Sequence, residues 1–179
     1  MKPVSAAVRR KAEKIRMLLL DVDGVLTDGR IIIDEKGVET KHFDVRDGQG
    51  ISLLKHAGIG VGLISGRSSN SVRHRARELG IPLVYQGVRN KAGIYDKVKL
   101  KAGLDDDQIA YVGDDIVDLP ILQRAGLAVG VKNGWPELRP LVDYVTEASG
   151  GRGAVREIAE LLLKAQDKWD SVTRHYYQL

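Results

Sequence analysis

Residues 17–29 read MLLLDVDGVLTDG, and this stretch holds the most informative pattern in the chain. The apolar run Met17–Leu20 predicts a buried strand, and the carboxylates of Asp21 and Asp23 follow directly at its end. Burying unpaired carboxylates costs several kcal/mol, so these two acids require a partner of opposite charge. A hard divalent cation with oxygen ligands would be such a partner. Taken alone, the two acids are also explained by an Asp-rich turn. The rest of the chain therefore decides between a turn and a cation site.

Two other known motifs do not fit this sequence. An EF-hand loop starting at Asp21 needs glycine at its sixth position, where this chain has Leu26. A dinucleotide-binding fingerprint at Gly58, Gly60 and Gly62 would have to follow a strand, whereas these glycines precede one.

The composition describes an ordinary globular chain of 179 residues, which is enough for one domain with a full core. Hydrophobic residues make up 43% and charged residues 29%, as in soluble proteins. The absence of cysteine excludes disulfides, thiolate metal sites and thiol nucleophiles, and it suits a cytoplasmic protein. The four histidines do not have the spacing of a zinc site.

The charge balance is mildly basic, with 28 Lys and Arg against 24 Asp and Glu. Such a balance suits small anionic substrates as well as nucleic acid. The few aromatic residues are not interleaved with the basic ones, so we predict no nucleic-acid partner. Since no apolar run approaches the length of a membrane span, and the N-terminus lacks the apolar core of a signal peptide, we expect no membrane partner and a cytoplasmic location.

Short apolar runs alternate with amphipathic stretches along the chain, which predicts a parallel sheet covered by helices on both faces. The expected strands are 17–22, 60–64, 83–86, 109–112, 127–131 and 143–145, and the expected helices are 4–15, 48–57, 69–79, 92–102, 116–125 and 154–169. Two strand-like runs, 30–34 and 38–44, predict an inserted β-hairpin. The predicted fold is therefore α/β, a Rossmann-like doubly wound parallel sheet. It forms one domain over residues 1–179, with the hairpin at about 30–44 and a C-terminal helix and tail at about 154–179.

Polar side chains follow four of the predicted strands. Ligands of open α/β sheets gather at the carboxyl ends of the strands, so these side chains are expected to meet at one edge. They are Asp21 and Asp23, then Ser65, then Lys91 at the end of a loop, and then Asp114, Asp115 and Asp118.

This set of groups suits phosphoryl transfer. One carboxylate can attack phosphorus, and a second can protonate the leaving oxygen and later activate water. Mg²⁺ held by carboxylates would offset the repulsion between the anions. A hydroxyl at a strand end and a lysine can hold the phosphoryl oxygens.

The chain resembles the haloacid dehalogenase superfamily of aspartate-nucleophile phosphatases. DVDGVLTDG at 21–29 and GDDIVDLP at 113–120 match its first and fourth motifs, and Ser65 and Lys91 match the second and third. The resemblance implies that Asp21 is the nucleophile, Asp23 is the general acid/base, and Ser65 and Lys91 complete the catalytic set. It also implies a Mg²⁺ site formed by Asp21, the backbone carbonyl of Asp23, and Asp114, with Asp115 and Asp118 as supporting groups.

Within the superfamily, the chain is similar to the phosphatases of 3-deoxy-D-manno-octulosonate 8-phosphate (KDO 8-phosphate). The similarity lies in the missing cap domain, the hairpin, the segment DVRDG at 44–48 and GGRGAVRE at 150–157. It implies a Mg²⁺-dependent phosphomonoesterase of lipopolysaccharide precursor synthesis. It also implies a homotetramer in which each subunit helps to close a neighbour's site. The implied substrate-binding residues are Asp23, Asp44, Val45, Arg46, Asp47, Gly48, Arg67, Arg75 and Lys91.

Several alternatives stay open from the sequence. Val117 occupies a position where relatives can have a polar substrate contact, and a nine-carbon sugar acid 9-phosphate of the sialic acid or KDN type is the other candidate substrate. A catalytically silent Mg²⁺-binding scaffold is an alternative from a different class. The segment Gly150–Gly153 is either a flexible entry to the last helix or a segment that reaches a neighbouring subunit, and residues 171–179 match no family pattern.

Overall fold

Six parallel strands form the central sheet of this computed structural model, in which residues 4–177 are described. The strand order is β5-β4-β1-β6-β7-β8, and every neighbouring pair is parallel. The bounds are β1 Met17–Leu20, β4 Gly60–Ile64, β5 Leu83–Tyr85, β6 Ile109–Gly113, β7 Leu127–Gly130 and β8 Tyr144–Val145. The predicted doubly wound α/β fold is confirmed, and β1, which carries the acidic motif, lies in the middle of the sheet.

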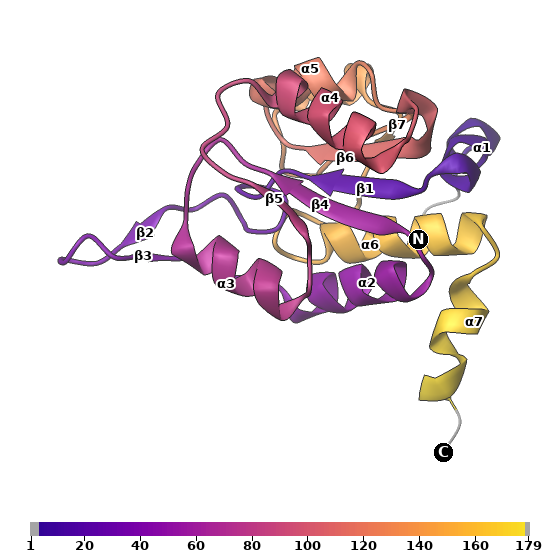
Figure 1. Ribbon diagram of the computed structural model, residues 1–179, viewed down its shortest axis with the longest axis horizontal. Helices are drawn as coiled ribbons and strands as arrows, with labels where there is room; N and C mark the ends of the chain where they lie inside the picture. Colours follow the sequence, from indigo (N-terminus) through magenta and orange to yellow (C-terminus); the bar gives the residue numbers. More distant parts are fainter. Residues whose placement is uncertain (1–3, 178–179) are drawn as a thin grey trace.

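Helices cover both faces of the sheet (Figure 1). One face carries α4 and α5, and the other carries α2, α3 and α6. The α-helices are α1 Ala6–Lys14, α2 Val45–His56, α3 Asn70–Glu78, α4 Lys91–Ala102, α5 Leu119–Leu122, α6 Ala154–Ala165 and α7 Trp169–Thr173. The 3₁₀ helices are η1 Asp106–Gln108, η2 Ile116–Asp118, η3 Pro136–Leu141 and η4 Arg174–Tyr176. The described helices include none that is long and apolar enough to cross a membrane.

The side chains of β1 divide between two hydrophobic clusters, because alternate residues of a strand point to opposite faces. Leu18 and Leu20 belong to the larger cluster, which includes the apolar residues of α2 and α6. Leu19 belongs to the smaller cluster with Tyr95 of α4. All four residues are fully buried. The strand that ends at Asp21 is therefore held from both sides.

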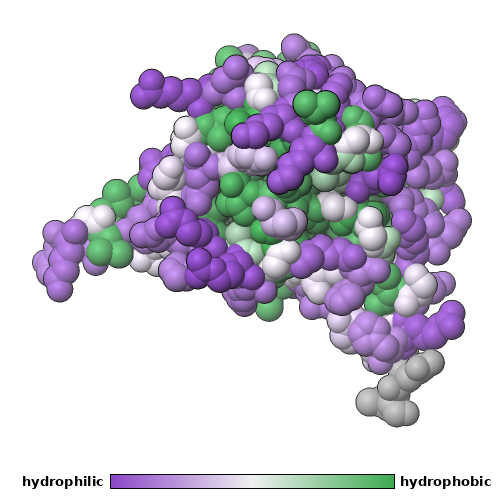
Figure 2. Space-filling model, in the orientation of Figure 1, coloured by the Kyte–Doolittle hydropathy of each residue, from purple (hydrophilic) through white to green (hydrophobic). Residues whose placement is uncertain are grey.

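The inserted hairpin is a separate antiparallel pair of short strands, β2 Ile32–Ile33 and β3 Glu39–Thr40. It projects away from the body of the molecule (Figure 1). Its turn is closed by Asp34, whose carboxylate accepts hydrogen bonds from the backbone N–H groups of Lys36 and Val38. The hairpin is where the sequence predicts it, but its strands are shorter than the runs 30–34 and 38–44. Hydrophobic side chains are exposed along it, as Figure 2 shows at the left.

Three helices differ from their predicted ranges for local reasons. Helix α2 begins at Val45 instead of residue 48, because the Asp44 carboxylate caps it by accepting from the N–H of Arg46. The predicted helix 116–125 is broken into η2 and the short α5, which has Pro120 near its start. The predicted helix 154–169 ends at Ala165, because Asp167 has a φ of +53° and the chain turns before α7. The end of the predicted tail, residues 178–179, lies outside the described residues.

Candidate active site

The carboxyl ends of β1, β4 and β6 meet at one pocket. Its lining includes Asp21, Asp23, Ser65, Lys91 and Asp114, the five residues that the sequence places in the catalytic and metal sets. Asp21 directly follows β1, Ser65 directly follows β4 and Asp114 directly follows β6, while Lys91 is the first residue of α4. As expected for residues that follow parallel strands, groups up to 93 residues apart in the sequence, Asp21 and Asp114, meet in this pocket.

Asp21 is held by contacts to two neighbouring elements. Its backbone N–H donates to the carbonyl of Val112 on β6 at 3.0 Å, and its carboxylate Oδ1 accepts from Lys91 Nζ at 2.6 Å. Burial and the nearby negative charge of Asp118 raise the pKa of Asp21, although Lys91 opposes the shift. Lys91 therefore fixes one carboxylate oxygen of Asp21, and the other oxygen has no such contact with the lysine.

Lys91 connects Asp21 to a buried hydrogen-bond network. Its ammonium lies 2.7 Å from Asp118 Oδ1 and 3.4 Å from the hydroxyl of Tyr111, which itself donates to Asp118 at 2.6 Å. Burial disfavours the lysine's charge, but Asp21 and Asp118 outweigh that effect and raise the pKa of Lys91 above its ordinary value. Lys91 is therefore held in its charged form beside the carboxylate of Asp21.

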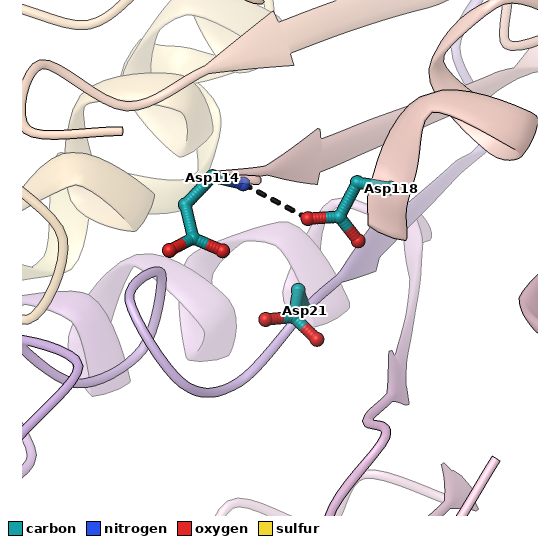
Figure 3. Close-up of side chains that lie close together, drawn as sticks. All are labelled: Asp21, Asp114 and Asp118. Carbon is teal, nitrogen blue, oxygen red and sulfur yellow. Dashed lines mark hydrogen bonds between the residues drawn. The ribbon is translucent and has the colours of Figure 1, made fainter. Parts of the chain in front are cut away.

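Asp21, Asp114 and Asp118 form an acidic cluster (Figure 3). One carboxylate oxygen from each lies within 4.8 Å of the others. Asp118 Oδ2 accepts from the backbone N–H groups of Asp114 at 3.0 Å and Asp115 at 3.3 Å, so both oxygens of Asp118 have protein donors. Asp118 therefore orients the loop after β6, and Asp21 and Asp114 carry the oxygens that are available to a cation.

The chemistry of this cluster fits a divalent metal ion. Burial, together with the charges of Asp21 and Asp118, raises the pKa of Asp114 to about 7. Like charges that are buried together are costly unless a cation neutralises them. Gly24 lets the carboxylate of Asp114 approach the loop after β1, because a Cβ on Gly24 would overlap it. This chemistry supports Asp21 and Asp114 as metal ligands. The backbone carbonyl of Asp23 stays a predicted third ligand.

Ser65 and Asp23 occupy the side of the pocket nearest β4 and the hairpin. Ser65 is buried, its N–H donates to the carbonyl of Tyr85 on β5, and its Oγ accepts from the N–H of Arg67 at 3.3 Å. Asp23 is partly exposed, and its carboxylate contacts the ammonium of Lys41. The guanidinium of Arg67 lies near the other oxygen of Asp23, with Nε at 3.8 Å.

Six of the nine predicted substrate residues divide between two pockets. Asp23, Arg67 and Lys91 line the catalytic pocket, and so does Val117. Asp44, Val45 and Arg46 line a second pocket with Asp28, His42, Phe43, Gly151 and Arg152, and the two pockets share no residue. Substrate contact by this second group stays a prediction, because these residues do not line the catalytic pocket.

The other three predicted substrate residues have structural partners instead. Arg75 on α3 forms an ion pair with Glu78 at 2.9 Å, and its guanidinium lies against α2, where a Cβ on Gly48 would overlap it. The Asp47 carboxylate is buried and accepts from the N–H groups of Gly153 at 3.2 Å and Arg156 at 2.8 Å. Asp47 therefore caps the N-terminus of α6, and burial raises its pKa to about 6.

The segment Gly150–Gly153 packs against the acidic loop of its own subunit. The N–H of Gly151 donates to the carbonyl of Val25 at 2.8 Å, and a Cβ on Gly150 would overlap the carbonyl of Gly24. The N–H of Gly150 also donates to Asn133 Oδ1 at 2.7 Å. These contacts lie within one chain, so contact of this segment with a neighbouring subunit stays a prediction.

The sequence did not indicate Tyr111, Lys41 and Glu39, which contact Asp118, Asp23 and Arg67 respectively. Tyr111 could have been inferred, because a tyrosine in a fully buried strand needs a partner for its hydroxyl. Glu39 and Lys41 carry no comparable signal, since the charged residues of a hairpin are ordinarily solvated.

Comparisons with known proteins agree with this site. Residues 83–158 match the model of the haloacid dehalogenase-like hydrolase family. The chain is 48% identical over 168 residues to 3-deoxy-D-manno-octulosonate 8-phosphate phosphatase KdsC of Escherichia coli (strain B / BL21-DE3), covering 94% of this chain and 89% of that relative.

Two crystal structures of such phosphatases are closely similar to this fold. The one from Yersinia pestis has a TM-score of 0.92 at 44% identity and covers 93% of this chain and 90% of that chain. The one from Moraxella catarrhalis, in complex with magnesium ion, phosphate ion and KDO, has a TM-score of 0.92 at 43% identity and covers 94% of this chain and 97% of that chain.

Fold and site together define the class, which is that of the haloacid dehalogenase-like hydrolases. At these levels of identity and coverage, the chain belongs within that class to the family of 3-deoxy-D-manno-octulosonate 8-phosphate phosphatases.

Proposed function

We propose that this chain is a Mg²⁺-dependent phosphomonoesterase that hydrolyses KDO 8-phosphate to KDO and phosphate. The observation that carries the proposal is the convergence of Asp21, Asp114, Ser65 and Lys91 on one pocket, in a chain 48% identical to a relative of that activity. The structure from Moraxella catarrhalis, with its magnesium, phosphate and KDO, supports the choice of cofactor and sugar acid.

The chain's own residues account for both halves of the reaction. A carboxylate oxygen of Asp21 bonds to phosphorus while the bond from phosphorus to the sugar oxygen breaks, and Asp23 gives a proton to that oxygen. Asp23 then takes a proton from water, whose oxygen bonds to phosphorus and releases the carboxylate of Asp21.

Lys91 and Ser65 hold the phosphoryl oxygens during these steps, and Lys91 keeps Asp21 in one orientation. Asp21 and Asp114, with the carbonyl of Asp23, would hold Mg²⁺, which supplies the positive charge that offsets repulsion between carboxylate and phosphate.

Arg67 is suited to bind the sugar acid's carboxylate. Its side chain is 46% exposed and reaches the pocket that contains Asp23. A guanidinium binds a carboxylate through two parallel hydrogen bonds, which a lysine cannot do.

The working unit we propose is a homotetramer of single-domain subunits, in which a neighbour contributes to each site. Two observations support this assembly. The hairpin exposes Ile31, Ile32, Ile33 and Val38, a set of apolar side chains that water disfavours (Figure 2). The second pocket, with Asp44 to Arg46, shares no residue with the catalytic pocket, so these residues would meet substrate across a subunit interface. We also propose the cytoplasm as its location, which the absence of cysteine favours.

Steady-state kinetics on two substrates test the proposal. We expect hydrolysis of KDO 8-phosphate in the presence of Mg²⁺, its loss with a chelator, and a clear preference over a nine-carbon sugar acid 9-phosphate. Since the nucleophile is indispensable, Asp21→Asn should lower kcat by at least about 10⁴-fold, whereas Asp105→Asn, on the exposed loop before η1, should not.

A preference for the nine-carbon ester would change the proposed substrate. An Asp21→Asn variant as active as the wild type would contradict the enzymatic account in favour of a silent scaffold.

A further inference from the structure

Lys41 is a buried cation at the base of the hairpin, directly after β3. Its side chain is only 1% exposed, and burial of an ammonium is unfavourable unless it has charged partners. Those partners are Asp23, whose Oδ1 the ammonium contacts, and Glu39, whose Oε1 lies 3.2 Å away. Lys41 thus ties the hairpin to the proposed general acid/base.

Glu39 makes a parallel connection from the same short segment. Its Oε1 accepts from the guanidinium of Arg67 at 2.8 Å, and its backbone carbonyl accepts from Ser71 Oγ on α3 at 3.4 Å. The hydrogen bond from Arg67 is the main reason that the pKa of Glu39 falls to about 2. Glu39 is therefore an ionised partner of both Arg67 and Lys41.

Four charges of alternating sign result, from Asp23 through Lys41 and Glu39 to Arg67. Asp23 and Arg67 line the catalytic pocket, whereas Glu39 and Lys41 do not. The hairpin residues can therefore influence the reaction only through the two pocket residues that they hold. Without Lys41, the nearest cation to the Asp23 carboxylate among residues 4–177 would be Arg67 at 3.8 Å, too long for a hydrogen bond.

We propose that Glu39 and Lys41 are positioning residues for the reaction. Lys41 fixes the carboxylate of Asp23 where the sugar oxygen leaves, and Glu39 fixes the guanidinium of Arg67 where the substrate's carboxylate binds. This inference rests on the proposed function, and it makes the hairpin part of the active-site architecture.

The first test compares leaving groups in the Lys41→Met variant. The ratio kcat/KM includes only the steps through departure of the leaving group. A sugar oxygen departs with a proton from Asp23, whereas p-nitrophenolate departs without one. We expect kcat/KM for KDO 8-phosphate to fall by at least about tenfold, and for p-nitrophenyl phosphate by less than about threefold, because a misplaced acid loses most of its catalytic effect. Lys41→Arg, which restores a cation, should recover most of the loss.

The second test concerns substrate binding in the Glu39→Gln variant. We expect KM for KDO 8-phosphate to rise by about three- to tenfold, since a charge-assisted contact to Arg67 becomes a neutral one. Kinetics on p-nitrophenyl phosphate, which has no carboxylate, should not change. Lys36→Met and Glu35→Gln, at the exposed turn of the same hairpin, are matched controls that should behave as the wild type does.

The outcomes separate this inference from the proposed function. Wild-type protein that does not hydrolyse KDO 8-phosphate would contradict the function itself. The positioning roles are wrong if the wild type is active but Lys41→Met and Glu39→Gln have the wild-type ratio of kcat/KM for KDO 8-phosphate to kcat/KM for p-nitrophenyl phosphate. Equal losses of activity on both substrates would leave that ratio unchanged and would contradict the roles in the same way. Should Lys41→Met fail to fold, Lys41→Gln, which removes the charge but keeps a polar group, takes its place with the same expected results, and Glu39→Gln tests the other positioning role independently.

Discussion

Asp47 and Asp114 are carboxyl groups whose pKa values are raised by burial, to about 6 and about 7, and the pKa of Asp21 is raised in the same direction. A carboxyl whose pKa is higher in the folded chain binds its proton more tightly there. It therefore contributes stability at pH values below its unfolded pKa near 3.8, and that contribution is lost as the pH rises through 6 to 7.

We accordingly predict that the metal-free protein is less stable at pH 8 than at pH 5.5. The melting temperature in a chelator should fall by roughly 3–8 °C between these pH values, at ~2–4 °C for each kcal/mol in a chain of this size. Mg²⁺ should raise the melting temperature more at pH 8, where protons no longer compete for Asp21 and Asp114. Asp114→Asn should reduce both effects, and a melting temperature that rises steadily with pH in the chelator would contradict the prediction.

Individual residues of the site were predictable to different degrees. The meeting of Asp21, Ser65 and Asp114 follows from one rule, that polar residues after parallel strands share an edge. Lys41 shows the limit, because nothing local indicates that a hairpin lysine turns inward to Asp23. Its burial depends on how the hairpin meets the sheet, which is a tertiary property.

At the scale of elements, the acidic loop after β1 and the segment before α6 depend on each other. Gly24 and Gly150 approach so closely that a Cβ on Gly150 would overlap the carbonyl of Gly24. The φ angle of Gly150 lies outside the left-handed region, so this contact, rather than backbone strain, requires glycine there. Asp47 fixes the far end of the same segment.

We therefore predict that Gly150→Ala displaces the loop that carries Asp21 and Asp23. Overpacking of this kind should lower the free energy of unfolding by about 1–3 kcal/mol. It should also reduce kcat while changing KM little. Chemical denaturation and steady-state kinetics measure the two effects. Gly130→Ala is the matched control, because a Cβ there would meet its nearest neighbour at an ordinary 3.6 Å. A Gly150→Ala variant with wild-type stability and kcat would mean that the contact is not a constraint.

The existence of the elements was easier to predict than their ends. Apolar periodicity located all six sheet strands, since a buried parallel strand has few alternatives. The boundaries of α2 and α6 moved because of single polar residues, the Asp44 cap and the turn at Asp167. The segment 44–48, which resembles a substrate loop, thus forms the N-terminal cap and first turn of α2.

For the whole molecule, the exposed apolar side chains of the hairpin are the feature that a single subunit does not explain. The hairpin contributes no residue to the lining of the catalytic pocket and leaves Ile31, Ile33 and Val38 more than half exposed. Apolar side chains gathered on a projecting element favour burial against another protein surface. The proposed tetramer supplies such a surface from identical chains, and it would also bring the second pocket of one subunit towards a neighbour's site.

We predict that Ile33→Lys dissociates the assembly without unfolding the subunit, because Ile33 is 58% exposed and contributes little to the core of its own chain. Light scattering coupled to size-exclusion chromatography should give a wild-type mass of four 19.7 kDa chains and a smaller mass for the variant. The dissociated variant should also lose kcat/KM for KDO 8-phosphate more than for p-nitrophenyl phosphate, since in the proposed tetramer a neighbour's Asp44 to Arg46 would contact only the sugar acid. Leu100→Lys on α4, where leucine is 85% exposed, is the matched control and should remain tetrameric. An Ile33→Lys variant that keeps the wild-type mass would exclude the hairpin from the interface, and a monomeric wild type with full activity would mean that each site is complete within one chain.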